Sequence, residues 1–151
     1  DPGLLDFIIC NICKEYLEKF SYRVYVETDP LGYTFLIAFD ETTPIGFIDD
    51  FVSDDEVLTD EMFADASLHN PKGAWQMIFG LNTLPEYRNL GVGGQLIEAF
   101  IELTREENRK GVILTCKEEK IHYYAKFGFV NEGESESDHG GAKWYQMRLE
   151  L

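Results

Sequence analysis

Residues 84–100 read LPEYRNLGVGGQLIEAF, and three of the four positions 91–94 are glycine. The run WQMIFGLNTL at 75–84 has the character of a strand, and an amphipathic run of helical spacing follows the glycines. The first N–H groups of a helix have no intrahelical partner and carry a partial positive charge, and glycine lets an anion approach the backbone closely. The stretch therefore predicts a strand, a phosphate-binding turn and a helix.

Two familiar phosphate-binding loops do not fit this turn. A P-loop requires a lysine after its last glycine, and no lysine follows here. The dinucleotide-binding pattern G-x-G-x-x-G requires glycine at the position that Leu96 occupies. The pattern that remains is R-x-x-G-x-G, from Arg88 to Gly93. An ordinary strand-to-helix turn would also account for these glycines.

Length and charge narrow the class of protein. The chain of 151 residues predicts a single domain spanning 1–151. Its 28 Asp and Glu residues against 13 Lys and Arg residues give a net charge of −15, which disfavours nucleic acid as a partner. The acidic surface would attract cationic substrates, or it only maintains solubility.

The apolar runs and the cysteines of the sequence disfavour a membrane partner and a bound metal. No apolar run reaches the ~20 residues of a membrane span, so we expect no membrane partner. Three cysteines fit a reducing compartment, and we expect a cytoplasmic protein. Cys10 and Cys13 form a C-x-x-C, but no second pair completes a zinc site, so we expect no metal.

Hydrophobic periodicity predicts strands and helices that alternate along the chain. Early hairpin strands and a late strand-helix-strand unit indicate an α/β or α+β layered domain. The expected helices cover 14–24, 58–66, the run after the glycines to 110, and 118–127, and the expected strands cover 33–39, 45–51, 75–84, 112–116, a start at 129, and 145–151. We expect a polar loop at 131–141.

The hexamer Arg88-Asn89-Leu90-Gly91-Val92-Gly93 resembles the pyrophosphate-binding signature of the GNAT superfamily of acyl-CoA-dependent N-acyltransferases. The entry GLNTLPEYR at 80–88 and the run YYAKFGF at 123–129, similar to Y-x-x-x-G-F, strengthen the resemblance over residues 33–151. It implies a mixed, mostly antiparallel sheet flanked by helices, with a splayed strand pair holding acyl-CoA. The first strand and helix of the family are not matched in residues 1–15, so we expect this part to be shortened.

The resemblance also assigns roles in binding acetyl-CoA. The side chain of Arg88 and the backbone of the turn would hold the pyrophosphate. The turn residues are Asn89, Leu90, Gly91, Val92, Gly93 and Gly94. Backbone groups of Leu81 and Thr83 would pair with the pantetheine arm and the acetyl carbonyl, and an N–H there would stabilise the oxyanion. Gly80, unusual inside a strand, would mark the bulge that opens this gap.

Tyr124 matches the tyrosine of the family motif, which implies that its phenol protonates the departing CoA thiolate. A packing aromatic is the alternative. Tyr123 points ~100° away on a helix, and we expect it in the core.

Other stretches, among them LTDEMFADASLHNPKG at 58–73, resemble a bacterial branch related to the arylalkylamine N-acetyltransferases. The animal enzymes carry two histidines on the strand before the turn, and those positions align with Met77 and Phe79, neither of which can act as a base. Substrate candidates elsewhere are Asp49, Phe51, His69, His139, Trp144 and Tyr145. The alternatives for them are turn acids, loop hydrogen bonds and core aromatics.

Together these patterns favour an acetyl-CoA-dependent N-acetyltransferase that moves an acetyl group to the primary amine of a small molecule by direct attack. Two other functions remain open: acetylation of protein or peptide amino groups, and a module that binds acyl-CoA without chemistry. The sequence is also compatible with a homodimer.

Overall fold

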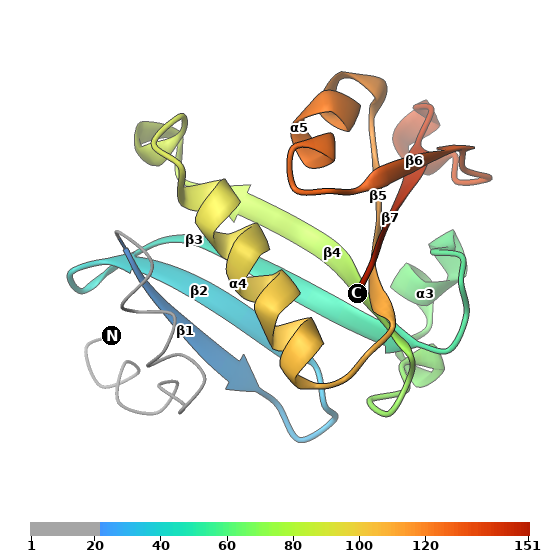
Figure 1. Cartoon of the computed structure of the whole chain (residues 1–151), viewed down its shortest axis with the longest axis horizontal. Coiled ribbons are helices and arrows are strands. Elements are labelled where there is room, and N and C mark those ends of the chain that lie inside the picture. Colours follow the sequence, from blue (N-terminus) through green and yellow to red (C-terminus); the bar gives the residue numbers. More distant parts are fainter. Residues whose placement is uncertain (1–21) are drawn as a thin grey trace. The chain divides into compact units, whose positions relative to one another are not determined.

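The structure is a computed structural model that describes residues 22–151 (Figure 1). Residues 1–15, where a shortened first strand and helix are expected, and most of the helix expected at 14–24 lie outside the described residues. Backbone contacts divide the chain into two compact units, one holding 22–50 and 79–103 and the other holding 51–78 and 104–151.

The fold is mixed α/β, with a seven-stranded, mostly antiparallel sheet flanked by helices, as the sequence predicts. The strand order is β1-β2-β3-β4-β5-β7-β6, and β4 and β5 pair in parallel. The strands are β1 (Arg23–Thr28), β2 (Thr34–Asp40), β3 (Thr43–Ser53), β4 (Trp75–Thr83), β5 (Gly111–Cys116), β6 (Val130–Glu134) and β7 (Tyr145–Glu150). The helices are α3 (Asp60–Ala64), α4 (Val92–Glu106) and α5 (Ile121–Ala125).

The first unit places helix α4 across one face of the antiparallel strands, as Figure 1 shows in yellow. Leu36 and Ala38 of β2 are fully buried, while Phe35 and Ile37 on the alternate face are half-buried. A Cβ on Gly46 would lie 3.2 Å from Val92 and 3.3 Å from Leu96, so the absence of a side chain lets α4 pack closely on β3. Apolar burial of this kind is the main term that stabilises the unit.

The second unit is built around β5, which pairs with the start of β4 and with β7. Two fully buried polar side chains satisfy one another, because the Thr104 hydroxyl donates to Gln76 Oε1 at 2.7 Å. Gln146 of β7 is also buried, and its Oε1 accepts the Leu58 N–H at 3.0 Å. These bonds tie the loop before α3 and the end of α4 to the strands of their unit.

Two of the expected elements are wrong. Arg23 and Val24, expected to end a helix, begin strand β1 instead, because Val24 and Tyr25 are buried and every residue of β1 pairs with β2. Strand β6 starts next to the position expected at 129, but it continues through residues 131–134, where a polar loop is expected, because pairing with β7 satisfies their backbone although their side chains are polar and mostly exposed. In both cases pairing with a partner strand decided the local structure.

Candidate functional site

The turn before α4 is held by two long-range hydrogen bonds within the first unit. The Leu84 N–H donates to the Ile45 carbonyl at 2.8 Å, and the Tyr87 hydroxyl donates to Asp40 Oδ2 at 2.7 Å. A short 3-10 turn, Pro85–Tyr87, then leads into the glycine stretch. The approach to the helix is therefore anchored to β2 and β3.

The glycine stretch leaves backbone donors open at the start of α4. Asn89 and Gly91 have positive φ values of 63° and 86°, and a turn of this conformation can present neighbouring N–H groups to an anion. The Gln95 N–H donates to the Gly91 carbonyl at 3.0 Å, so the N–H groups of Val92 to Gly94 precede the hydrogen-bonded part of the helix. The helix has 15 residues, enough to carry a substantial dipole. This end of α4 is suited to bind a phosphate.

Arg88 lies beside these donors and is exposed. Its Nε donates to the Thr83 carbonyl at 3.4 Å, a long hydrogen bond that orients the side chain weakly. Across residues 22–151 no carboxylate forms an ion pair with it, so its terminal nitrogens are available to an anion. Arg88 and the open N–H groups thus lie at the same end of α4, as the sequence predicts.

Gly80 in the middle of β4 has an identifiable reason. A Cβ at this position would lie 2.7 Å from Asp49 Oδ1, so a side chain here would displace that carboxylate. Within the described residues, Asp49 Oδ1 is buried and accepts no hydrogen bond of good geometry. Burial raises the pKa of the Asp49 carboxyl, and the N–H groups of Asp49 and Gly80 partly oppose the rise. Asp49 therefore lies against β4, one residue from Leu81.

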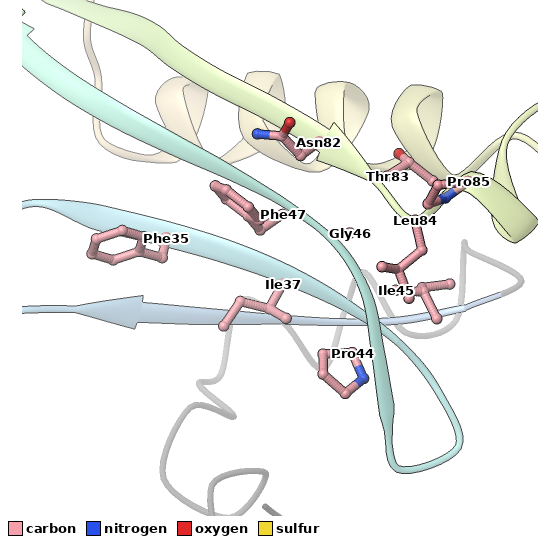
Figure 2. Close-up of a pocket in the computed structure, with 10 residues that line it drawn as sticks. All are labelled: Phe35, Ile37, Pro44, Ile45, Gly46, Phe47, Asn82, Thr83, Leu84 and Pro85. Carbon is pink, nitrogen blue, oxygen red and sulfur yellow. The ribbon is translucent and has the colours of Figure 1, made fainter.

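A pocket of about 360 Å³ opens on the same unit (Figure 2). Its walls are mostly apolar, and side chains of β2 and β3 face the end of β4 and the turn that follows it. The lining residues are Phe35, Ile37, Pro44, Ile45, Gly46, Phe47, Asn82, Thr83, Leu84 and Pro85. Thr83, predicted to pair with the cofactor, is one of them.

Tyr124 lies on α5 in the second unit and is half-buried. Its ring makes edge contacts with Tyr123, at 5.2 Å between centroids, and with Phe129 at 6.1 Å. Burial, with smaller contributions from Cys116 and Tyr123, raises the pKa of Tyr124 to about 12. Its phenol is therefore protonated at neutral pH and is chemically a proton donor.

Tyr123 does not lie in the core, contrary to the expectation. Its ring is half-buried, and the ammonium groups of Lys120 and Lys126 lie 6.0 and 5.8 Å from its centroid. Burial also raises the pKa of Tyr123. Cys116 is buried, and burial with the nearby Glu119 raises the pKa of its thiol to about 11, so the thiol is neutral and unreactive at pH 7.

Two of the predicted substrate residues in the second unit pack together. Phe51 has no exposed surface, which favours the core alternative, and a role in lining an amine pocket stays a prediction. Its ring meets the His69 ring edge-on at 5.4 Å, and His69 Nδ1 accepts the Val52 N–H at 3.0 Å. That nitrogen is occupied by a backbone donor, which favours the loop hydrogen-bonding alternative for His69.

The other predicted substrate residues of this unit lie near β7. The Trp144 Nε1–H donates to the His139 carbonyl at 2.8 Å, and the Lys117 ammonium lies 5.8 Å from the Trp144 centroid. Tyr145 begins β7 and pairs with Cys116 of β5 and Glu134 of β6. The bonds of His139 and Trp144 order this loop, and a role in substrate binding stays a prediction.

The pocket and the Asp49–Gly80 contact were not predicted from the sequence. The only signal was the unexplained glycine inside a strand.

No cluster of His, Cys, Asp or Glu in residues 22–151 could hold a metal ion. In the same part of the chain, no helix is long and apolar enough to cross a membrane.

Comparison with known protein families identifies a match over most of the chain. A family model described as an acetyltransferase (GNAT) domain matches residues 31–131, which include the glycine turn and Tyr124. No curated protein sequence matches the chain significantly.

Solved structures share the fold at low sequence identity. A GNAT-family acetyltransferase from Streptococcus pneumoniae is 19% identical, with a TM-score of 0.60 over 82% of this chain and 69% of that chain. Nourseothricin acetyltransferase is 19% identical, with a TM-score of 0.57 over 85% of this chain and 82% of that chain. A candidate streptothricin acetyltransferase from Bacillus anthracis, solved with acetyl coenzyme A, is 21% identical, with a TM-score of 0.59 over 79% of this chain and 62% of that chain.

Proposed function

The chain belongs to the GNAT acetyltransferase family, and we propose that it is an acetyl-CoA-dependent N-acetyltransferase whose acceptor is the primary amine of a small molecule. The observation that carries the proposal is the open end of α4. Backbone donors with no helical partner lie there beside an exposed arginine that has no ion-pair partner in residues 22–151. An anion with several oxygens, such as the pyrophosphate of CoA, would satisfy both.

The cofactor roles follow from these groups. Arg88 and the N–H groups of residues 89–94 would bind the pyrophosphate, and the planar guanidinium would contact it through two donors. Backbone groups of Leu81 and Thr83 would pair with the pantetheine arm as a neighbouring strand does. An N–H of this segment would polarise the thioester carbonyl and stabilise the oxyanion formed on attack.

The transfer requires two protons to leave the acceptor nitrogen. An amine of pKa near 10.4 is neutral for only about one molecule in a thousand at pH 7, so a base that takes the first proton speeds the reaction. The nitrogen lone pair then forms the C–N bond, the C–S bond breaks, and the second proton balances protonation of the thiolate. The products are the acetamide, CoA thiol and one proton released to solvent.

We propose that Tyr124 supplies the proton to the thiolate. Its phenol stays protonated at neutral and moderately alkaline pH, because its pKa is raised to about 12. Within the described residues its hydroxyl has no assigned hydrogen-bond partner, which leaves the proton available. This role is implied by the family motif.

A panel of amines tests the proposed function. The full-length protein would be incubated with acetyl-CoA and with aromatic, aliphatic and polyamine acceptors, basic peptides and no acceptor, and thiol release would be followed. We expect release with at least one small primary amine and little without an acceptor. Preference for the peptides would replace this proposal with protein acetylation. Tight acetyl-CoA binding by calorimetry without transfer to any acceptor would indicate a non-catalytic module.

A further inference from the structure

The pocket of Figure 2 has no charged side chain among the described residues that line it. Phe35 and Ile37 of β2 and Phe47 of β3 form one wall, because paired and alternate residues of neighbouring strands share a face of the sheet. Leu84, in the turn after β4, lies at another side. Phe47 and Leu84 are each 40% exposed, so apolar surface in this pocket is open to water.

One end of the pocket lies level with the middle of β4. A Cβ on Gly46 would lie 2.8 Å from the Asn82 carbonyl oxygen, and a Cβ on Gly80 would lie 2.7 Å from Asp49 Oδ1. The strands β3 and β4 are neighbours in the sheet, and these two contacts show that they run in opposite directions. Because Phe47 follows Gly46 by one residue, it is level with the residue of β4 that precedes Asn82.

That residue is Leu81, in the segment whose backbone would bind the thioester carbonyl under the proposed function. Thr83, which would pair with the pantetheine arm, lines the pocket itself. We propose that the pocket of Figure 2 binds the acyl chain of the donor, and that the protein uses acyl-CoA thioesters whose apolar chain is longer than the single methyl group of acetyl. The inference rests on the proposed function and deepens it by naming the class of acyl donor.

The lack of charge in the lining favours the acyl chain over the amine as the occupant. At pH 7 the amine is mostly an ammonium ion, and an ammonium group removed from water needs a carboxylate to offset the cost of desolvation. Asn82 and Thr83 are the polar residues of the lining, and neither is ionised. A hydrocarbon chain is neutral and gains free energy when apolar walls cover it.

The size of the pocket limits the length of the chain. Its volume of about 360 Å³ is roughly twelve times the ~30 Å³ that one water molecule occupies in the liquid, so several methylene groups fit. Along β3 the pocket extends from Phe47 to Pro44, about 10 Å at ~3.3 Å per residue. Carbon–carbon bonds of ~1.5 Å span that distance in roughly six to eight bonds. A hexanoyl chain therefore fits within the pocket.

The walls of the pocket are held in place without a ligand. The Leu84 N–H donates to the Ile45 carbonyl at 2.8 Å, which fixes the turn after β4 against β3. The bare backbone of Gly46 lets the two strands approach at Asn82. A chain that covers Phe47 and Leu84 thus gains free energy from the apolar area removed from water, with little loss of wall entropy.

The bonds that form and break are those of the transfer proposed above. The amine nitrogen forms a C–N bond to the carbonyl carbon, and the C–S bond to CoA breaks. The acyl chain stays bonded to the carbonyl carbon throughout. The products are the amide, CoA thiol and one proton released to solvent, and no further reactant is required.

Donor binding tests the pocket independently of catalysis. Calorimetry would compare acetyl-CoA, hexanoyl-CoA and glutaryl-CoA, whose chain ends in a carboxylate, on the full chain. The variants are Phe47→Ala and Leu84→Ala, which each remove part of the walls, and the control Phe63→Ala. Phe63 is 53% exposed on α3 and does not line the pocket, so its replacement makes the same change elsewhere. Melting temperatures would establish that each variant is folded.

Each methylene that leaves water should tighten binding about fourfold. Because the pocket is partly open, we expect wild type to bind hexanoyl-CoA about 10- to 100-fold more tightly than acetyl-CoA, and glutaryl-CoA no more tightly than acetyl-CoA. The ratio of hexanoyl-CoA to acetyl-CoA affinity should fall about 3- to 10-fold in Phe47→Ala and in Leu84→Ala, and it should keep its wild-type value in Phe63→Ala. Equal affinity of folded wild type for hexanoyl-CoA and acetyl-CoA, or a ratio that neither pocket variant lowers, would overturn the acyl-chain pocket.

Kinetics separate this inference from the proposed function. If hexanoyl-CoA binds through Phe47 but no amide forms with any amine of the panel, the pocket stands and acyl transfer is refuted. If acetyl transfer occurs while hexanoyl-CoA neither binds more tightly nor reacts, the proposed function stands and the acyl-chain pocket is refuted. With an active amine, we expect KM for hexanoyl-CoA to be about 10-fold or more below KM for acetyl-CoA.

Discussion

The arginines near the two ends of helix α4 differ in how many hydrogen bonds and ion pairs they form. At the C-terminal end, Arg109 donates to the Gly73 carbonyl at 2.6 Å and to the Pro71 carbonyl at 2.9 Å, and it pairs with Glu107 at 2.7 Å. At the N-terminal end, Arg88 makes one long bond to its own loop and has no carboxylate partner in residues 22–151. Arg109 holds a loop in place within its unit, whereas the terminal nitrogens of Arg88 have no carboxylate partner in residues 22–151.

Two tyrosines, and likewise two aspartates, differ in whether a side-chain oxygen has a hydrogen-bond partner. The hydroxyl of Tyr87 is bound to Asp40, whereas that of Tyr124 has no assigned partner among the described residues. Asp50 accepts a backbone N–H, whereas the buried Oδ1 of Asp49 accepts none of good geometry. Because an unsatisfied polar group costs free energy, Tyr124 is the member of its pair expected to meet a substrate or cofactor.

The largest expected effect concerns Tyr124. The Tyr124→Phe variant should fold, bind acetyl-CoA normally and lose ~10²–10⁴-fold in kcat, because the change removes only the proton donor. The loss will be smaller if water protonates the thiolate efficiently. Steady-state kinetics would measure it, and Tyr123→Phe should keep most of its activity. Equal losses in the two variants would contradict the distinction between these tyrosines.

The pH dependence gives a second readout on this residue. Tyr124 acts in its protonated form, and that form persists until the pH approaches about 12. Wild-type kcat should therefore show no decline from this group up to pH 10. The raised pKa also means that the stability contributed by the neutral phenol is present below pH ~10, the pKa of an unfolded tyrosine, and is lost as the pH rises toward 12. Tyr124→Phe should lack this part of the alkaline destabilisation.

The next effect concerns the turn itself. Gly93→Asp places a carboxylate where a pyrophosphate is expected, and like charges held close together cost several kcal/mol, so KM for acetyl-CoA should rise on the order of 100-fold or more. An acid in the first turn of a helix favours folding, so the melting temperature should not fall through its charge. A folded variant with an unchanged KM would remove the assignment of the anion site.

The arginine pair allows the comparison to be tested directly. Arg88→Ala should weaken acetyl-CoA binding by ~1.5–3 kcal/mol and leave the melting temperature almost unchanged. Arg109→Ala should lower stability by about 1–3 kcal/mol, because two carbonyls lose their donor, and leave cofactor affinity intact in the folded protein. Calorimetry and thermal unfolding measure both quantities. The distinction would be refuted if Arg88→Ala lowered the melting temperature and Arg109→Ala weakened acetyl-CoA binding.

The smallest effect concerns the net charge of −15. If the acidic surface attracts cationic amines, kcat/KM for them should fall by a factor of a few, up to about ten, as ionic strength rises from 10 to 200 mM. A neutral or anionic acceptor should show no such decline. A flat response to salt would mean that the acidic residues only maintain solubility.

Local patterns predicted those elements whose residues carry the information themselves. Strands β2, β3, β4 and β5 are continuous apolar or alternating runs, and their predicted bounds agree with the structure to within a few residues. The start of α4 and the place of Arg88 also followed from the sequence, because the glycines, the arginine and the helix are adjacent. The prediction failed for β1 and for residues 131–134 of β6, whose backbone is ordered by pairing with β2 and β7.

What the sequence determined by itself is the position of Arg88 and the glycines at the N-terminal end of α4, since these residues lie within a single turn of chain and their spacing sets their geometry. Only the tertiary structure decided which polar groups lack a hydrogen-bond partner. Asp49 meets Gly80, Arg109 meets Gly73, and Phe47 meets Ile37 through strand register and loop packing between residues distant in the sequence. A one-residue shift in register would turn Asp49 to the other face of the sheet, so its position beside Gly80 depends on a pairing that no local pattern encodes.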